Sequence, residues 1–209
     1  MNARTEKLAI AGPAGKLQIL RDQPEGTAVG VAVIAHPHPL HGGTMDNKVV
    51  QTLARAFVQC GWTAVRLNFR GVGESEGAYD EGRGELQDML AAVQGFAPTG
   101  PLALAGFSFG AFVAASALEQ LWDARDVRHV VLVGTAASRF TVPALPPQSH
   151  ERALVVHGEV DETVTLQSVF DWARPQSLPV TVVPGVEHFF HGQLPLLKNM
   201  VVRHLRTQG

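Results

Sequence analysis

The chain alternates short apolar runs with longer segments of helical periodicity. Most of the apolar runs are continuous rather than alternating, which is typical of strands covered on both faces of a parallel sheet. Six strands are predicted from these runs: Val29–Ala35, Trp62–Phe69, Pro101–Phe107, Arg128–Gly134, Arg152–His157 and Pro179–Val183.

Between the strands, apolar residues recur with the spacing of one helix face. Helices are predicted at Asp46–Cys60, Glu85–Phe96, Phe109–Leu121, Thr163–Ala173 and Gln193–Arg206. The third of these is apolar on nearly all sides, so it should be buried. Repeated alternation of strand and helix predicts an α/β fold with a mostly parallel central sheet and helices on both faces. Lys7–Leu20 is expected to add one or two antiparallel edge strands.

Length and charge favour one globular domain over residues 1–209 and exclude some partners. A chain of 209 residues fits one domain better than two, and its 45% hydrophobic and 17% charged residues are ordinary for a globular protein. The 17 Lys and Arg residues against 19 Asp and Glu residues give a net charge of −2. No nucleic acid or polybasic membrane contact is therefore expected, because both need a large cationic surface.

The sequence also indicates a soluble, cytoplasmic protein. Its one cysteine, Cys60, allows no intrachain disulfide and no cysteine-based zinc cluster, which fits a reducing compartment. The first 25 residues contain no apolar run of signal-peptide length, and the longest apolar stretch, Ala111–Leu118, is too short to span a bilayer. A homodimer is compatible with the sequence, which leaves the oligomeric state open.

The motif Gly106-Phe107-Ser108-Phe109-Gly110 carries the clearest chemical signal. It follows a predicted strand and opens a predicted helix, the context in which G-x-S-x-G forms a nucleophile elbow. The glycines allow the close backbone approach of a tight turn, and the serine oxygen then projects at the carboxyl ends of the strands. The alternative is that the glycines only pack helix against strand and Ser108 is incidental.

A serine nucleophile needs a base and an orienting carboxylate. The order Ser, Asp or Glu, His expected for an α/β-hydrolase is met by Ser108, Asp161 and His188, each just after a predicted strand. Glu159 and Glu162 compete with Asp161, whose alternative role is a helix N-cap. His191 competes with His188.

Backbone N–H groups should stabilise the oxyanion of the tetrahedral intermediate. The first is predicted at Phe109, directly after the nucleophile, and the second at His38, with Leu40 as the next donor because proline has none. The spacing of His36, His38 and His41 invites a metal site, but no carboxylate follows until Asp46, so no metal is predicted.

Four segments together resemble the α/β-hydrolase superfamily: Gly106–Gly110, Asn68–Ser75, Gly158–Asp161 and Glu187–Phe190. With His36–Gly43, the chain resembles more narrowly the small bacterial lidless serine hydrolases related to dienelactone hydrolases. The resemblance covers about residues 15 to 205 and implies hydrolysis of small esters or thioesters without a cofactor. Dienelactone hydrolases proper use a cysteine nucleophile, whereas Ser108 stands here, which sets the chain apart from that subfamily's own reaction.

The predicted site is open. Only residues 135–151 separate two predicted strands where many hydrolases of this fold insert a lid domain. The apolar walls of the substrate site are expected from Leu40, Phe107, Phe109, Phe189 and Phe190. Arg70, which begins the glycine-rich loop Arg70–Gly84, is expected either to anchor that loop or to touch the pocket.

Three functions are compatible with these features. The preferred one is a serine ester or thioester hydrolase acting on a small molecule. A non-catalytic scaffold that binds a ligand is the second, but such proteins usually lack a member of the triad. A peptidase or dehalogenase reaction is the third; dehalogenases of this fold use an aspartate nucleophile, and peptidases usually add domains to bind a peptide.

Overall fold

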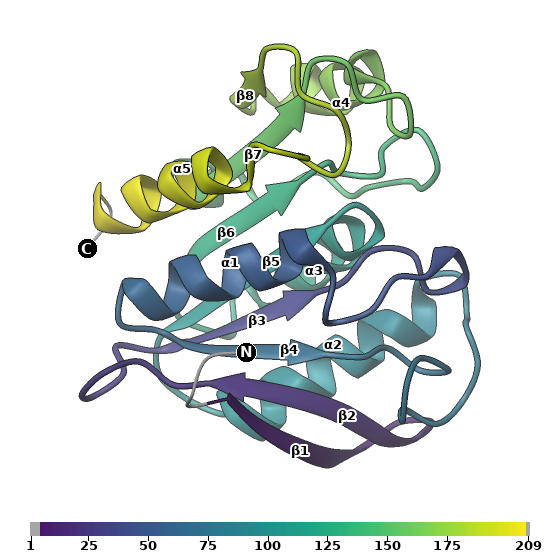
Figure 1. Cartoon of the computed structure of the whole chain (residues 1–209), viewed down its shortest axis with the longest axis vertical. Coiled ribbons are helices and arrows are strands. Elements are labelled where there is room, and N and C mark those ends of the chain that lie inside the picture. Colours follow the sequence, from purple (N-terminus) through teal and green to yellow (C-terminus); the bar gives the residue numbers. More distant parts are fainter. Residues whose placement is uncertain (1–4, 208–209) are drawn as a thin grey trace.

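Eight strands form one sheet within residues 5–207, the part of the chain that the computed structural model describes (Figure 1). They are β1 (Thr5–Gly12), β2 (Gly15–Asp22), β3 (Val31–Ala35), β4 (Thr63–Leu67), β5 (Leu102–Phe107), β6 (Val127–Val133), β7 (Ala153–Gly158) and β8 (Val180–Val183). Their order is β1-β2-β4-β3-β5-β6-β7-β8. The hairpin of β1 and β2 adds to β4 in antiparallel fashion, and all pairings from β4 to β8 are parallel. The predicted fold class is confirmed.

Helices cover both faces of this sheet. They are α1 (Lys48–Gln59), α2 (Arg83–Phe96), α3 (Phe109–Leu121), α4 (Leu166–Ala173) and α5 (Leu194–Thr207). Helices α1 and α5 pack together on one face, whereas α2, α3 and α4 contribute to the core on the other (Figure 1). Successive strand residues point to opposite faces. In β3, Ala32 and Ile34 therefore join the core under α1 and α5, and Val33 joins the other core.

Helices α1, α2, α4 and α5 begin one to three residues from their predicted starts, and local hydrogen bonds explain the differences at α2 and α4. Helix α2 begins at Arg83 rather than Glu85, because the Glu85 carboxylate accepts the backbone N–H groups of Asp80 and Gly82 (2.9 and 2.8 Å) and so satisfies the helix start. Helix α4 begins at Leu166 rather than Thr163, because the preceding backbone N–H groups bond to Asp161.

The parallel strands all end at the same edge of the sheet, and the arrowheads of β3, β4, β6 and β7 point toward the right in Figure 1. The segments that follow β3, β5, β6, β7 and β8 therefore meet there, which brings residues far apart in the sequence into one site. Within residues 5–207, no helix is long and apolar enough to cross a bilayer.

Candidate active site

Ser108 lies in a strained turn between β5 and α3. Its φ and ψ are 57° and −116°, a conformation that L-residues rarely adopt. A Cβ atom on Gly106 would lie 2.1 Å from the Gly110 carbonyl oxygen, and one on Gly110 would lie 2.3 Å from the Ala35 carbonyl oxygen. Both contacts are too short for any side chain, so the two glycines are what allow the turn to form.

His188 lies beside this serine, on the segment between β8 and α5. Its Nε2 atom is 3.0 Å from Ser108 Oγ, and its Nδ1 atom is 2.6 Å from Asp161 Oδ2. With Nδ1–H donating to the carboxylate, Nε2 is left to accept the serine hydroxyl proton. The rings of Phe107 and Phe189 pack against the imidazole, with centroids 4.8 and 5.1 Å from it, and restrict its orientation.

Asp161 follows β7 and is held by the turn that precedes α4. Its Oδ1 atom accepts the backbone N–H groups of Thr163 and Val164 at 2.9 and 2.7 Å. Burial by itself would raise the pKa of Asp161, but the hydrogen bonds from His188 and Val164 outweigh it and hold the pKa below its usual value. Asp161 is therefore an anion in the neutral pH range, aimed at His188.

The residues that were alternatives to Asp161 and His188 make other contacts or are exposed. Glu159 accepts the backbone N–H of Gly185 at 2.8 Å, and the side chain of Glu162 is exposed. His191 is also exposed, with Nδ1 3.1 Å from Glu187. The structure thus brings Ser108, His188 and Asp161 together and leaves these three alternatives outside the hydrogen-bonded chain.

A second buried imidazole, that of His157, also lies next to the Asp161 carboxylate. Its Nε2 atom lies 2.9 Å from the Val164 carbonyl oxygen and 3.5 Å from Asp161 Oδ2. Burial lowers the pKa of His157, so the ring is neutral and donates Nε2–H to the Val164 carbonyl oxygen. Sequence reasoning missed this residue, because it is one of several polar residues near the end of a predicted strand and nothing local marks it out.

The two backbone N–H groups predicted to bind the oxyanion lie on different elements. Phe109 is the first residue of α3, and its N–H has no carbonyl one turn earlier in the helix to bond to. His38 precedes a short 3₁₀ turn, Pro39–His41, and no hydrogen bond from its backbone N–H occurs within the described residues. The N–H of Leu40, the alternative donor, is engaged by the Nδ1 atom of His38 at 3.2 Å.

A cavity of about 480 Å³ opens at Ser108; we call it the Ser108 cavity. It is lined by His38, His41, Ser108, Phe109, Ala136, Arg139, Phe140, Thr163 and Val164. Of the predicted walls only Phe109 takes part. Leu40 is 67% exposed, Phe107 and Phe190 are buried in the core under α1 and α5, and Phe189 lies against His188. The wall formed by residues 136–140 was missed, because that segment lies between elements and has no periodic pattern.

Arg70 anchors its own loop and does not line the Ser108 cavity. Its Nε and Nη2 atoms donate to the Asp88 carboxylate at 3.0 and 2.8 Å, and its backbone N–H donates to the same group at 2.9 Å. This settles its role in favour of the loop. Among the described residues, no cluster of three histidine, cysteine, aspartate or glutamate side chains is arranged to hold a metal ion.

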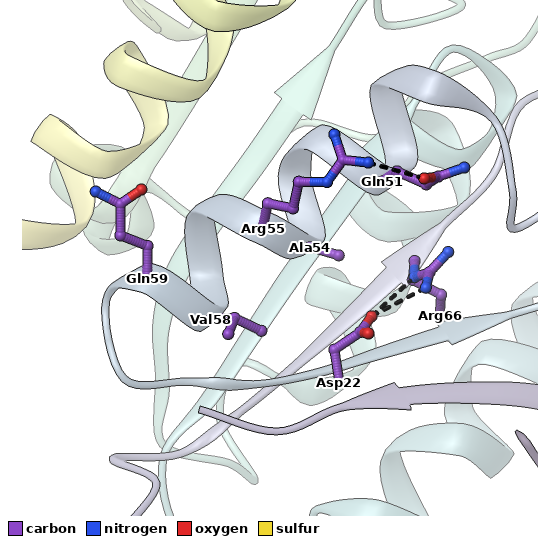
Figure 2. Close-up of a pocket in the computed structure, with 7 residues that line it drawn as sticks. All are labelled: Asp22, Gln51, Ala54, Arg55, Val58, Gln59 and Arg66. Carbon is purple, nitrogen blue, oxygen red and sulfur yellow. Dashed lines mark hydrogen bonds and ion pairs between the residues drawn. The ribbon is translucent and has the colours of Figure 1, made fainter. Parts of the chain in front are cut away.

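A second pocket, of about 360 Å³, lies beside α1; we call it the Arg66 pocket (Figure 2). Its lining residues are Asp22, Gln51, Ala54, Arg55, Val58, Gln59 and Arg66. Figure 2 shows the Arg66 guanidinium pointing at Asp22, to which it donates at 3.0 and 3.2 Å. It also donates to the Met45 carbonyl at 2.9 Å, and Arg55 donates to Gln51 at 3.0 Å.

Comparison with known proteins agrees with this geometry. A family model described as serine aminopeptidase, S33, matches residues 38–172. The chain belongs to this family. It is also similar to the crystal structure of XC6422 from Xanthomonas campestris, described as an α/β serine hydrolase without lid, with 35% identity, a TM-score of 0.87 and coverage of 99% of this chain and 96% of that one.

Two further relatives extend the comparison. An α/β serine hydrolase homologue from Coxiella burnetii is 40% identical, with a TM-score of 0.81 and coverage of 96% of this chain and 97% of that chain. An uncharacterized protein of Rickettsia prowazekii is 29% identical over an alignment of 197 residues, with coverage of 86% of this chain and 79% of the relative. The prediction that the chain is a small lidless α/β-hydrolase is therefore confirmed, and so is its general assignment as a hydrolase.

Proposed function

We propose that this protein hydrolyses small carboxylic esters or thioesters through an acyl-enzyme on Ser108. The observation that carries the proposal is the continuous hydrogen-bonded chain from Ser108 Oγ through His188 to Asp161, with separations of 3.0 and 2.6 Å, at the mouth of a cavity. A serine activated by a histidine and an oriented carboxylate is the arrangement that acyl transfer requires.

In the first half of the proposed reaction, Ser108 Oγ bonds to the substrate carbonyl carbon and its proton moves to His188 Nε2. The carbonyl oxygen becomes an oxyanion, and the N–H groups of Phe109 and His38 are the proposed donors to it. The start of α3 adds the positive end of the helix dipole at the same place. When the tetrahedral intermediate collapses, the bond to the leaving oxygen or sulfur breaks and His188 returns the proton to the leaving group.

In the second half, a water molecule attacks the acyl-enzyme and gives a proton to His188. The bond between Ser108 Oγ and the acyl carbon then breaks, the proton returns to the serine, and the carboxylic acid leaves. Asp161 carries its negative charge throughout and stabilises the imidazolium that forms in each half. The low pKa of Asp161 supports this role, because it keeps the carboxylate ionised beside the cation.

The lining of the Ser108 cavity supports an ester substrate over a peptide with a free amino terminus. An aminopeptidase needs a negative group to bind the α-ammonium of its substrate. Among the described residues that line the cavity there is no aspartate or glutamate, and the one fully charged side chain is the cation of Arg139. The family's name therefore does not by itself extend to this chain's substrate.

The test is to label the protein with a fluorophosphonate probe and to measure hydrolysis of p-nitrophenyl acetate and of an acyl-CoA thioester. Ser108→Ala should abolish both labelling and turnover. Ser116→Ala is the matched control, because its hydroxyl lies on the same helix but only donates to the Phe112 carbonyl at 3.0 Å. Saturable ester binding without turnover by the unaltered protein would support the non-catalytic alternative instead.

A further inference from the structure

The wall of the Ser108 cavity that contains Arg139 is a fixed turn. The backbone N–H groups of Arg139 and Phe140 both donate to the Ala136 carbonyl, at 3.1 and 3.0 Å. The Phe140 ring stacks on Phe112 of α3 with centroids 4.8 Å apart and planes 10° apart, and it meets Phe109 edge-on at 5.1 Å. Because Phe109 adjoins the nucleophile, this stacking ties the position of the turn to that of Ser108.

The Arg139 side chain is exposed and unpaired. Over residues 5–207, no ion pair or side-chain hydrogen bond engages its guanidinium, although it lines the cavity. Arg66 and Arg70 differ in this respect, since each donates to a buried carboxylate at 3.0 Å or less. A free guanidinium presents a planar fork of donors that matches a carboxylate.

The rest of the cavity adds to this preference for an anion. The start of α3 contributes partial positive charge at Phe109, and the imidazoles of His38 and His41 are the other titratable groups in the lining. Glu162, next to the lining residue Thr163, is exposed and is not part of the wall. A substrate anion would therefore meet attraction without an opposing carboxylate in the described lining.

We propose that Arg139 determines specificity by binding a carboxylate on the substrate, so that the preferred substrates are acidic esters or thioesters. The anion would lie a few bonds from the scissile carbonyl. Ala136, Phe140 and Val164 would contact the apolar part between the two, and the cavity volume of about 480 Å³ suits a short chain of this kind. This inference rests on the proposed ester or thioester hydrolysis and names its substrate class.

The experiment compares ester pairs that differ only in charge. For the acyl side, p-nitrophenyl hexanoate is compared with mono-p-nitrophenyl adipate, in which a carboxylate replaces the terminal methyl group. For the leaving-group side, 4-acetoxybenzamide is compared with 4-acetoxybenzoate. In the unaltered protein we expect the acidic member of at least one pair to have the higher kcat/KM, and about 0.5 M salt should reduce that preference by screening.

Arg139→Gln should lower kcat/KM for the preferred acidic ester by about tenfold and change the neutral partner less than twofold, since only the charge-assisted contact is lost. Arg139→Lys should keep part of the preference, because it keeps the charge without the fork. Arg203→Gln is the matched control, as it removes an exposed arginine from α5, away from the cavity.

The outcomes separate the two proposals. If the unaltered protein cleaves neutral esters in a Ser108-dependent way but Arg139→Gln changes both members of each pair equally, the inference about Arg139 is wrong and the proposed function stands. If no ester or thioester is cleaved and Ser108→Ala changes nothing, the proposed function itself fails. Because Arg139 is exposed and unpaired, the variant should fold, which its thermal unfolding curve checks.

Discussion

An arginine lines both the Ser108 cavity and the Arg66 pocket. The two pockets differ in whether the protein supplies a partner for Arg139 and for Arg66. In the Arg66 pocket the guanidinium is 4% exposed and its donors reach Asp22 and the Met45 carbonyl (Figure 2). In the Ser108 cavity, Arg139 has no partner among the described residues, and the N–H of Phe109 has none within its helix. The Arg66 guanidinium, whose donors the protein itself engages, has little left to offer a ligand.

The two sites also differ in where strain is found. Ser108 is held at positive φ between glycines that admit no side chain, a conformation that costs about 1–3 kcal/mol. The Asp22–Arg66 pair involves no such strain at either residue, since the backbone outliers with side chains lie elsewhere in the described chain. Charged and polar groups stabilise the fold at Asp22 and Arg66, whereas at Ser108 they are arranged for a reaction. Substitutions at the two sites should therefore change either stability or activity.

The largest expected effect is on the Ser108 side. Asp161→Asn should keep the hydrogen bonds from Thr163 and Val164 but favour the wrong tautomer of His188, so kcat should fall by about 10⁴-fold. Steady-state hydrolysis of p-nitrophenyl acetate measures this. Glu159→Gln is the control, because Glu159 lies on the same loop and bonds only to Gly185. Equal losses in both variants would contradict the assignment of Asp161.

The next effect belongs to the Arg66 pocket and should change stability without changing chemistry. Asp22→Ala leaves the Arg66 guanidinium buried and without its main partner, which should lower the free energy of unfolding by about 3–5 kcal/mol. Urea denaturation measures the loss, and kcat/KM of the folded fraction should stay within about twofold of the original, because the two pockets share no lining residue.

Asp46→Ala provides a matched control at the same arginine. Asp46 also contacts Arg66, at 3.5 Å, but its side chain is 62% exposed. An exposed ion pair contributes at most about 1 kcal/mol, so this variant should be nearly as stable as the original protein. Similar losses for Asp22→Ala and Asp46→Ala would show that burial does not govern the Arg66 pocket and would remove the basis of the comparison.

The strands, turns and helices that carry Ser108, Asp161 and His188 could be predicted, because the sequence patterns that indicate them are local. A serine between two glycines after an apolar strand has one common structural meaning, and the loops after two later strands offered few acidic and imidazole side chains. Helix α3 was predicted with the bounds Phe109–Leu121 that the structure shows.

The walls of the Ser108 cavity were not predictable, because they depend on contacts between distant segments. Phe140 becomes a wall by stacking on Phe112, a pairing that no local pattern signals. Phe107 was expected in the site, yet alternation along β5 places it with Ala103 and Ala105 in the core under α1 and α5. Thr163 was expected to start a helix, but its N–H serves Asp161.

A smaller effect should come from His36, which follows β3 and is fully satisfied like Arg66. Its Nε2 atom accepts the Phe69 N–H at 3.1 Å and its Nδ1 atom donates to the Pro37 carbonyl at 2.6 Å. Burial lowers the pKa of His36 from 6.5 to about 4. The unfolded chain thus binds a proton at higher pH than the folded protein, so stability is complete above pH 6.5 and is lost as the pH falls toward 4.

His36→Asn should therefore flatten the pH dependence of unfolding in this range. The two pKa values correspond to about 3 kcal/mol of pH-dependent stability from this one imidazole. Urea denaturation at several values between pH 7 and pH 4.5 compares the slopes, with the exposed His41→Asn as the control. An unchanged slope in His36→Asn would mean that other groups, such as the buried His129, account for the acid sensitivity.

The smallest effect tests whether the cavity wall must be fixed for the Ser108 cavity to select its ligand. Phe140→Leu removes the stacked pair with Phe112 and the edge contact with Phe109, each worth about 1 kcal/mol, while keeping an apolar side chain. The turn that holds Arg139 should then sample more positions. KM for the preferred acidic ester should rise about fivefold with little change in kcat, because the reacting groups are untouched.

Phe170→Leu is the control, since that phenylalanine lies on α4 and lines a different hollow beside Leu178 and Val180. If Phe140→Leu, but not Phe170→Leu, raises KM more for acidic esters than for neutral ones, recognition depends on the position of the wall. An equal rise for neutral esters would instead mean that Phe140 acts only by contacting the apolar part of the substrate. In that case the position of the wall would not govern the selection of acidic esters, and only the Arg139→Gln comparison would decide whether the free guanidinium recognises the substrate.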